Sequence, residues 1–329
     1  MRTVRIAGTG IYTPTRSMPT EEVGAMLKLD LTQQIQTGGI KVKKIMADDE
    51  EASDLAVYAG MQALKNAGVK PSELDLIIVS TDTPDYISPC TASIVQHRLL
   101  AKNAGLFDTN VACAGWVTAL NTATKYIMAD QHFHKALVIG TYAMTRFLNW
   151  QDKVTAPTFS DGAGAAVLVE DESETGGYLG SMLYADGYYW DYLSVNLGSA
   201  RLPTAESVAN QEHKVQYNQN KRFPDVNSVH WPRLVRETLA QANLTPQDAD
   251  MLLFTQVRRN TIEGVMNTLG LPMTKTHTVM EKFGYTGSAC VPMALHDALE
   301  QDLIHSGDIV VMTASGGGYA MACYAMRWL

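Results

Sequence analysis

One cysteine lies in a setting that could support nucleophilic chemistry. Cys113 falls within DTNVACAGWVTAL, where an extended run gives way at ACAG to a helical pattern. A cysteine at a helix start lies near unpaired backbone amides, whose partial positive charge lowers the thiol pKa and favours the reactive thiolate. The small neighbours Ala112, Ala114 and Gly115 leave room for a substrate carbonyl. From position alone, a buried structural cysteine is the more common alternative.

A glycine-rich turn near the C-terminal end is the second feature. The run Ser315-GGGYAMA lies between two apolar segments that we predict to be strands. Consecutive glycines expose backbone N–H groups and allow a ligand or another backbone to come close. No Gly-Lys-Ser/Thr follows, which argues against a phosphate-binding loop. Taken alone, the pattern favours a tight hairpin, and Ser160-DGAGAAVLVE likewise indicates a glycine turn that leads into a strand.

The composition excludes several classes of protein. The chain has 329 residues, of which 46% are hydrophobic and 18% charged, and its net charge of −8 disfavours a nucleic-acid partner. We find no run that could cross a bilayer, no apolar signal segment and no metal-binding motif, so we expect a cytoplasmic protein without membrane contact, metal or bound cofactor. Cys90, Cys290 and Cys323 show no CxxC spacing and are interpreted as core residues.

Two parts of the chain share a pattern at an offset of 175 residues. Pro71 corresponds to Pro246 and Asp75 to Asp250, and each pair lies between an amphipathic helical segment and an apolar strand. The register continues from the helix that begins near Cys113 to the later segment SACVPMAL. Long apolar strands that alternate with helices predict a duplicated α/β unit whose sheets are covered on their faces.

A polar stretch separates the two copies. Residues 198–227 include NQEHKVQYNQNKRFPDVN and show little apolar periodicity. Such a segment is either a linker or a loop that caps a substrate entrance, and the linker is the simpler interpretation.

The motifs together resemble the ketoacyl-ACP synthase III family of the thiolase superfamily. The similarity is carried by GTGIYTP, NVACAG, SDGAGAAVL and SGGGYAMACYAMRWL, in that order, and by the duplicated units. It implies a five-layered αβαβα thiolase fold made of two duplicated halves. Residues 1–175 would form the half that carries Cys113, and residues 176–329 the half that carries Thr255, Tyr285 and the three-glycine turn.

The resemblance also implies roles for individual residues. The cysteine at the position of Cys113 attacks an acyl thioester and becomes acylated. The backbone N–H groups of Cys113 and Gly317 would form the oxyanion hole, where each donor typically contributes about 3 kcal/mol. With this resemblance included, Cys113 is interpreted as a nucleophile in preference to a structural cysteine.

Two departures from the family pattern affect the expected reaction. Thr255 takes the place of the family's histidine, and Tyr285 takes the place of its asparagine. In the condensing enzymes this pair binds the malonyl thioester and stabilises the enolate. A threonine hydroxyl is a weaker donor than imidazole and cannot act as a base near neutral pH. We therefore do not expect ordinary decarboxylative condensation.

Three functions remain open. The first is an acyltransferase that loads Cys113 and passes the acyl group to a nucleophilic small molecule through O, N or activated C, in secondary metabolism. In that case Thr255 and Tyr285 either orient the acceptor or only fill space. The second is a condensing ketoacyl synthase that handles the enolate by other groups. The third is a non-catalytic subunit paired with a homologue.

The donor site departs from the family pattern as well. Gln33 and Thr37 stand where the family has the Trp and Arg that hold the adenine of coenzyme A. An acyl carrier protein thioester therefore becomes more attractive than acyl-CoA as the donor. Arg258 and Arg259 could contact a phosphopantetheine phosphate or an acidic carrier protein. A solvated surface is the alternative for both arginines.

Pocket shape and assembly are inferred only from the resemblance. Trp116 lies one turn beyond the cysteine, and Ser315 replaces a bulky aromatic before the glycines, so both are expected to shape the substrate site. Ile87 corresponds to the segment that reaches across the family's dimer interface toward the partner's acyl tunnel. We expect a homodimer or a heterodimer with a homologue.

Overall fold

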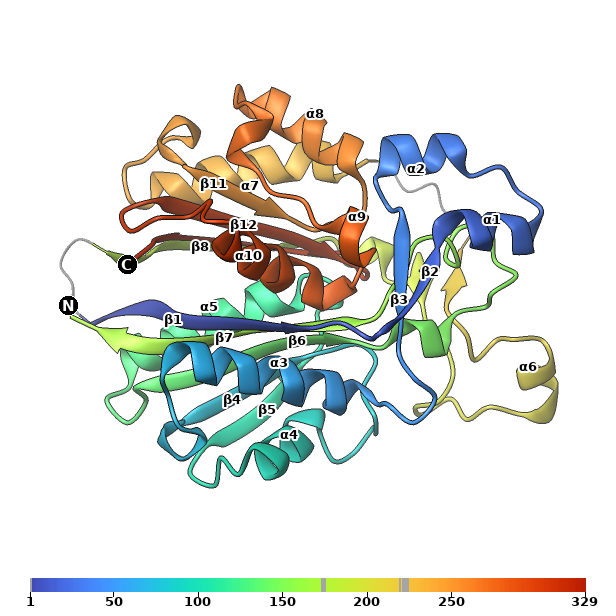
Figure 1. The fold of residues 1–329 in the computed structure, drawn as a ribbon, viewed down its shortest axis with the longest axis horizontal. Coiled ribbons are helices and arrows are strands. Elements are labelled where there is room, and N and C mark those ends of the chain that lie inside the picture. Colours follow the sequence, from blue (N-terminus) through green and yellow to red (C-terminus); the bar gives the residue numbers. More distant parts are fainter. Residues whose placement is uncertain (1, 173–175, 219, 221–224) are drawn as a thin grey trace.

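Two β-sheets, each covered by helices, form the body of the chain (Figure 1). The computed structural model describes residues 2–172, 176–218, 220 and 225–329. The first sheet has the strand order β1-β7-β6-β4-β5 and the second has the order β11-β12-β13-β8. The first-sheet strands are β1 (Thr3–Tyr12), β4 (Leu76–Ser80), β5 (Gly105–Thr109), β6 (Lys135–Tyr142) and β7 (Gly162–Asp171). The second-sheet strands are β8 (Gly177–Ala185), β11 (Met251–Phe254), β12 (Ile309–Gly316) and β13 (Ala320–Arg327).

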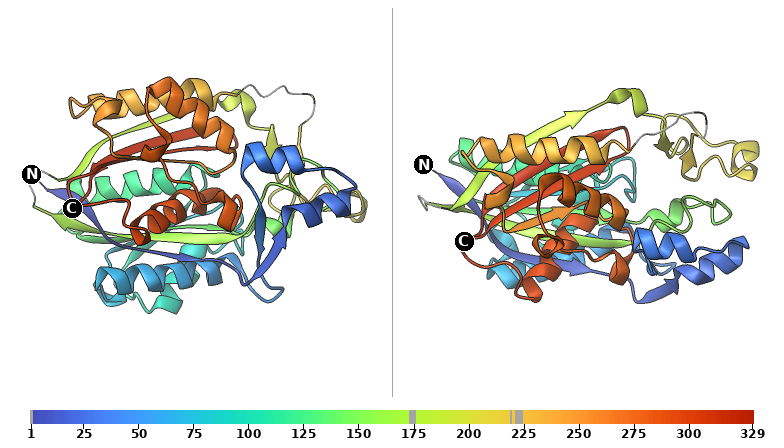
Figure 2. Two further views of the ribbon diagram at one scale, coloured as in Figure 1. Left: turned by 45° about the horizontal axis from the view of Figure 1, so that its top comes forward. Right: turned by 90° about the horizontal axis from the view of Figure 1, so that it is seen from above.

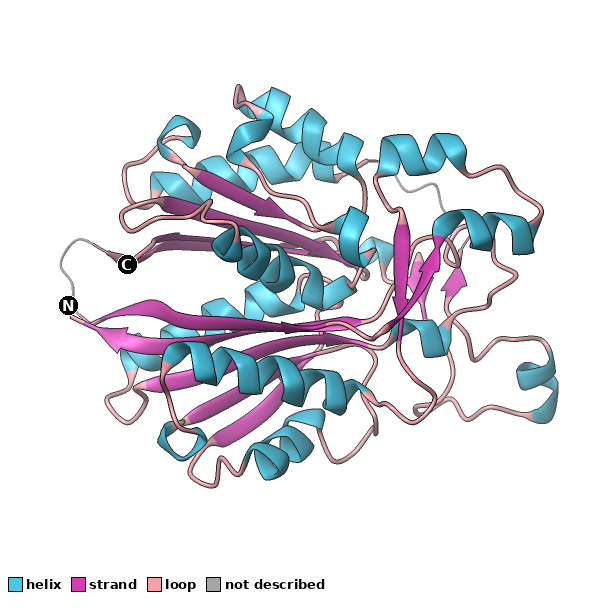
Figure 3. Cartoon of the chain, viewed as in Figure 1, coloured by secondary structure: helices cyan, strands magenta, loops and turns pink. Residues whose placement is uncertain are grey.

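Helices separate the sheets and cover their outer faces (Figures 1 and 3). The helices α5 (Gly115–Ala129) and α10 (Cys290–Glu300) lie between the sheets. The outer layers contain α3 (Ala52–Ala67) and α4 (Thr91–Leu99) on one side, and α7 (Asn227–Ala240) and α8 (Arg259–Leu269) on the other. The arrangement is an αβαβα sandwich, which confirms the predicted fold class.

The duplication predicted from the sequence is visible in matching hydrogen bonds. Pro71 and Pro246 each begin a 3₁₀ turn, in η1 (Pro71–Glu73) and η4 (Pro246–Asp248). The carboxylate of Asp75 accepts from Lys135 N at 3.0 Å, and that of Asp250 accepts from Ile309 N at 2.9 Å. Equivalent aspartates therefore fasten the equivalent pairs β4–β6 and β11–β12.

Two groups of smaller elements lie at one end of the sandwich (Figure 2). An N-terminal part there contains β2 (Arg16–Pro19), α1 (Thr20–Leu27), α2 (Thr32–Gly38) and β3 (Val42–Ile45). The polar stretch and its approach contain η3 (Gly187–Tyr189), β9 (Leu193–Ser194), α6 (Ala205–Ala209) and β10 (Gln216–Tyr217). The remaining elements are η2 (Met144–Phe147), η5 (Met273–Lys275), α9 (Met280–Phe283) and η6 (Gly287–Ala289). Within the described ranges, no helix has the length and apolar character needed to span a membrane.

A buried lysine on β3 binds the loop that precedes β7. Lys43 is fully buried, and its Nζ donates to the backbone carbonyl of Phe159. Burial lowers the pKa of Lys43 to about 7, while the carboxylate of Asp161 attracts its charge. The Phe159 ring lies 6.0 Å from that of Tyr142 and 5.6 Å from that of Tyr285, between centroids. Lys43 thus holds the aromatic ring that lies between these two tyrosines.

We predict that Lys43→Met lowers the free energy of unfolding by about 3–5 kcal/mol near pH 6.5, where Lys43 is still mostly charged and Asp161 mostly ionised, because it leaves the Asp161 carboxylate buried without its cation. Burial raises the pKa of Asp161 to about 6, so the carboxyl is protonated at lower pH and the loss should shrink near about pH 5. Urea unfolding at both pH values measures this effect, with the exposed Lys41→Met as the control. A loss of equal size at both pH values would contradict this explanation.

Candidate active site

Cys113 lies in a strained turn between β5 and α5. The preceding residue, Ala112, has a φ of 45°, in the left-handed region that alanine rarely adopts. Asn110 supports this conformation, because its Oδ1 accepts from Ala112 N at 3.2 Å. Helix α5 begins close against β4, where a Cβ on Gly115 would lie 2.0 Å from Ser80 Oγ. The small residues noted in the sequence are therefore required by the backbone here, in addition to leaving space for a substrate.

The three-glycine turn lies directly on the backbone of Cys113. A Cβ on Gly316 would lie 2.5 Å from Val111 O and 2.8 Å from Cys113 N. Gly317, by contrast, lines the cavity in front of the sulfur, and a Cβ there would have Leu193 O as its nearest neighbour, at 3.5 Å. Cys113 and Gly317 thus lie at one cavity, as an oxyanion hole built from their N–H groups would require.

The cavity has a volume of about 240 Å³ and collects residues from both halves of the chain. Its described lining residues are Asp82, Asn110, Ala112, Cys113, Tyr142, Met144, Trp190, Leu193, Ser194, Val195, Val215, Gly317 and Gly318. The Cys113 sulfur therefore has space beside it into which an acyl group could extend. Across the described ranges, no group of three or more His, Cys, Asp or Glu is placed to hold a metal ion.

Two buried phenols lie near the Cys113 sulfur. The hydroxyl groups of Tyr285 and Tyr142 each lower the Cys113 pKa and so favour the thiolate. Burial has the larger effect, however, and together with the Asp82 carboxylate it raises the pKa of Cys113 well above its usual value. The expected lowering of the thiol pKa by the helix start was therefore wrong, because the sulfur is removed from water.

Asp82 and Tyr142 were not predicted from the sequence. Tyr142 is the last residue of β6, and Asp82 lies two residues beyond the end of β4. These strands are parallel neighbours, so their carboxyl ends meet at the same sheet edge as the end of β5, which precedes Cys113. Polar residues just after successive predicted parallel strands were the signal that could have identified both. Burial raises the pKa of Asp82 to about 6.

Thr255 supports the glycine turn and is absent from the cavity lining. Its side chain is buried, and its Oγ1 accepts from the backbone N of Ser315 at 2.9 Å. Ser315 itself is buried beside it in β12, one residue before Gly316. The structure thus brings Cys113, Tyr285 and Gly317 together, while Thr255 and Ser315 lie behind the turn.

Other predicted substrate contacts are placed elsewhere. Trp116 is completely buried, its indole donates to Val138 O at 3.2 Å, and it is not among the residues that line the cavity. The role expected for Trp116 is therefore corrected to core packing, because its helix position points the ring at the first sheet. Ser315 likewise does not widen the described cavity. Ile87 is 73% exposed on the surface, a position that suits contact with another chain.

The two arginines differ in their surroundings. Arg259 forms an ion pair with Glu281, and its Nη2 also lies 3.4 Å from Thr278 Oγ1. Arg258 is exposed and close enough to Tyr192 to influence the charge on that phenol. Arg258 is thus the better placed of the two for contact with a donor phosphate.

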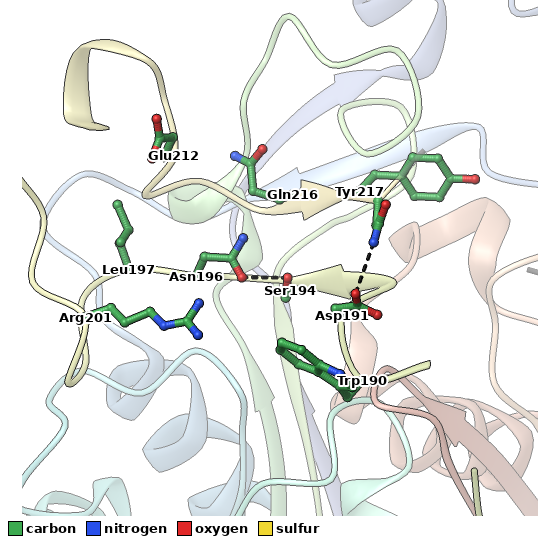
Figure 4. A pocket seen from close by; sticks show the side chains of 10 residues that line it. Trp190, Asp191, Ser194, Asn196, Leu197, Arg201, Glu212, Gln216 and Tyr217 are labelled. Carbon is green, nitrogen blue, oxygen red and sulfur yellow. Dashed lines mark hydrogen bonds between the residues drawn. The ribbon is translucent and has the colours of Figure 1, made fainter. Parts of the chain in front are cut away.

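A second, more polar cavity adjoins the first (Figure 4). It has a volume of about 480 Å³ and shares Trp190 and Ser194 with the Cys113 cavity. The guanidinium of Arg201 points into it, on the side of Trp190. Val215, from the polar stretch, reaches the Cys113 cavity itself. The described part of residues 198–227 therefore caps the site, whereas residues 219 and 221–224 of that stretch lie outside the described residues.

Comparison with known proteins agrees with this geometry. Two family models match, 3-oxoacyl-[acyl-carrier-protein] synthase III over residues 107–187 and its C-terminal part over residues 239–328. The chain is 36% identical to beta-ketoacyl-[acyl-carrier-protein] synthase III of Caldanaerobacter subterraneus subsp. tengcongensis, covering 98% of this chain and 97% of that protein. It is also 36% identical to the protein of the same name from Rhodospirillum centenum, with 98% of each chain covered.

Solved structures show the same likeness. The synthase III of Thermus thermophilus superposes with a TM-score of 0.90 at 30% identity, covering 99% of each chain. The priming beta-ketosynthase of the R1128 polyketide pathway also gives 0.90, at 27% identity, covering 99% of this chain and 96% of that one. The fold and site define a protein of the thiolase superfamily. Within it, the chain belongs to the ketoacyl-ACP synthase III family.

The glycine turn gives a paired prediction. Gly316→Ala should slow acylation of the cysteine by about a hundredfold or more, because the new methyl group would push Cys113 N out of position. Gly317→Ala keeps its N–H and meets only ordinary contacts, so it should retain most of the rate. Intact mass spectrometry after exposure to acyl thioesters measures both rates. Equal rates for the two variants would show that the contact between Gly316 and Cys113 is unimportant.

A second prediction concerns the phenols. Tyr285→Phe and Tyr142→Phe each remove a hydroxyl group that lowers the Cys113 pKa, so the pKa should rise further. At about pH 8 less thiolate is then present, and iodoacetamide should modify Cys113 about three- to tenfold more slowly. Peptide mass spectrometry follows modification at this residue, and the surface variant Tyr126→Phe is the control. Faster modification would mean that the phenols do not donate to the sulfur.

Proposed function

We propose that this protein is an acyltransferase that forms an acyl thioester on Cys113 and passes the acyl group to a nucleophilic small molecule without decarboxylating a malonyl unit. The observation that carries the proposal is the Cys113 cavity, with Gly317 at its wall and Asp82 as the only charged group among its described lining residues. Loading needs a sulfur nucleophile, a cavity for the acyl chain and amide donors for the oxyanion.

The surroundings of Cys113 suit thioester exchange. When its sulfur attacks a donor thioester, the new C–S bond forms and the donor's C–S bond breaks. The thiol proton passes to the departing sulfur, so the exchange leaves no net charge. A neutral, buried thiol is therefore compatible with loading, and Tyr285 and Tyr142 can donate to the sulfur as its charge grows.

Neither replaced residue is placed to stabilise an enolate. Thr255 uses its oxygen to accept from Ser315 N, behind the glycine turn. The Tyr285 hydroxyl lies near the Cys113 sulfur and favours its thiolate. A condensing ketosynthase is the second candidate, because the relatives at 36% identity carry that name. Under that alternative, another group would have to bind the malonyl carbonyl.

The proposal also covers the acyl donor and the association with a second chain. An acyl carrier protein is the favoured donor, with Arg258 near its phosphopantetheine phosphate, and acyl-CoA is the alternative. The exposed Ile87 and the exposed edge of β5 would face a second chain, either a copy of this one or a homologue. A role in natural-product biosynthesis fits a family member with an altered second half-reaction.

Loading and decarboxylation can be tested separately. We expect acetyl, butyryl or octanoyl thioesters of coenzyme A or a carrier protein to add one acyl mass to the wild type and none to Cys113→Ala. Malonyl thioester added to the acyl-enzyme should release no carbon dioxide. Release of carbon dioxide with formation of a ketoacyl product would establish the condensing function instead. If no donor loads and the protein copurifies with a homologue, a non-catalytic subunit is the correct interpretation.

A further inference from the structure

One charged side chain faces the Cys113 cavity without a partner. Asp82 lines the cavity, and its carboxylate has no hydrogen bond to another described residue; Oδ1 is shielded from solvent, so Oδ2 is the oxygen that a ligand in the cavity can reach. No lysine or arginine is found among the described lining residues of this cavity. A shielded carboxylate is costly unless a cation or several donors meet it. The missing partner is therefore expected to come from a ligand.

We infer that Asp82 binds the ammonium group of a primary-amine acceptor beside the acylated Cys113. The inference rests on the proposed function, since it names the class of molecule that receives the acyl group. An ammonium brings a compensating charge and three N–H donors, whereas an alcohol brings one donor and no charge. Asp82 and Cys113 line the same cavity of about 240 Å³, so an amine held at Asp82 shares that cavity with the thioester.

The transfer step balances with Asp82 as the proton acceptor. Asp82 takes one proton from the bound ammonium, which frees the lone pair of the nitrogen. The nitrogen attacks the thioester carbon, the C–N bond forms, and the carbonyl electron pair moves to oxygen. The carbonyl then re-forms, the C–S bond breaks, and a second nitrogen proton passes to the Cys113 sulfur. The products are an amide and the free thiol, and the proton on Asp82 leaves to water.

The adjoining cavity provides a route for such an acceptor. It meets the Cys113 cavity at Trp190 and Ser194 and carries polar side chains along its wall, among them Asn196 and Gln216 (Figure 4). A polar amine could pass through it without losing all its hydrogen bonds. Loading of the cysteine, which releases no net proton, does not need Asp82.

The test compares n-butylamine with n-butanol. Wild-type enzyme loaded with butyryl should transfer the group to n-butylamine, giving N-butylbutanamide, and transfer it far more slowly to n-butanol. Asp82→Asn should load at least as fast as the wild type, because its Cys113 pKa is lower, and amine transfer measured per loaded enzyme should fall about a hundredfold or more, with partial recovery in Asp82→Glu. The same Asn variant should react faster with iodoacetamide, because removing the carboxylate lowers the Cys113 pKa. Asp302→Asn, whose side chain is 92% exposed, is the charge-matched control.

Each outcome decides between the two proposals. Absence of loading in the wild type would contradict the proposed acyltransferase. Loading followed by equal transfer to amine and alcohol, or amine transfer undiminished in Asp82→Asn, would overturn the inference about Asp82 alone. If Asp82→Asn does not fold, the Cys113 pKa of the wild type is measured from the pH dependence of iodoacetamide modification, with and without n-butylammonium chloride. n-Butylammonium should lower this pKa because it neutralises Asp82, and n-butanol should not; an unchanged pKa with the amine would likewise reject the site.

Discussion

The contact between Gly316 and the backbone of Cys113 is the constraint on which the site depends. Any side chain at Gly316 would overlap Val111 O and Cys113 N, so the hairpin of the second sheet can approach the cysteine only through glycine. This approach places Gly317 at the cavity. Cys113 belongs to one half of the duplicated fold and the glycines to the other. The site therefore exists only when the two sheets are packed with α5 and α10 between them.

The same packing determines the electrostatics of the sulfur. Removing Cys113 from water raises its pKa, and the phenols of Tyr142 and Tyr285 offset only part of this effect. Asp82 acts in the same direction as burial, because two negative charges in one cavity repel each other. The resting site therefore favours a neutral thiol beside a carboxylate. Acylation removes the conflict, since a thioester carries no charge that Asp82 could oppose.

Much of the fold could be predicted because the sequence pattern of its α/β unit occurs twice in the chain. Matching residues such as Asp75 and Asp250 identified the same unit in each half, and both make the same bond to the next strand. Cys113 could be found because its neighbours in sequence are also its neighbours in space. Asp82 and Tyr142 could not be found in that way, since separate strands bring them together. Burial determines which way the Trp116 ring points and whether the Cys113 pKa is raised or lowered. The sequence around each residue does not show how deeply it is buried.

Under the proposed function, Thr255 supports the first reaction of the site and takes no part in the second. Its oxygen accepts from Ser315 N and so helps hold the hairpin that carries the glycines. A residue at this position can thus support the oxyanion donors while supplying no base. Thioester exchange needs no base at the position of Thr255, because the thiol proton moves from one sulfur to the other. Transfer to an amine that arrives as its ammonium ion does need a base, because the nitrogen must lose a proton before it can bond to carbon. Asp82 is the one carboxylate among the described residues that line the cavity.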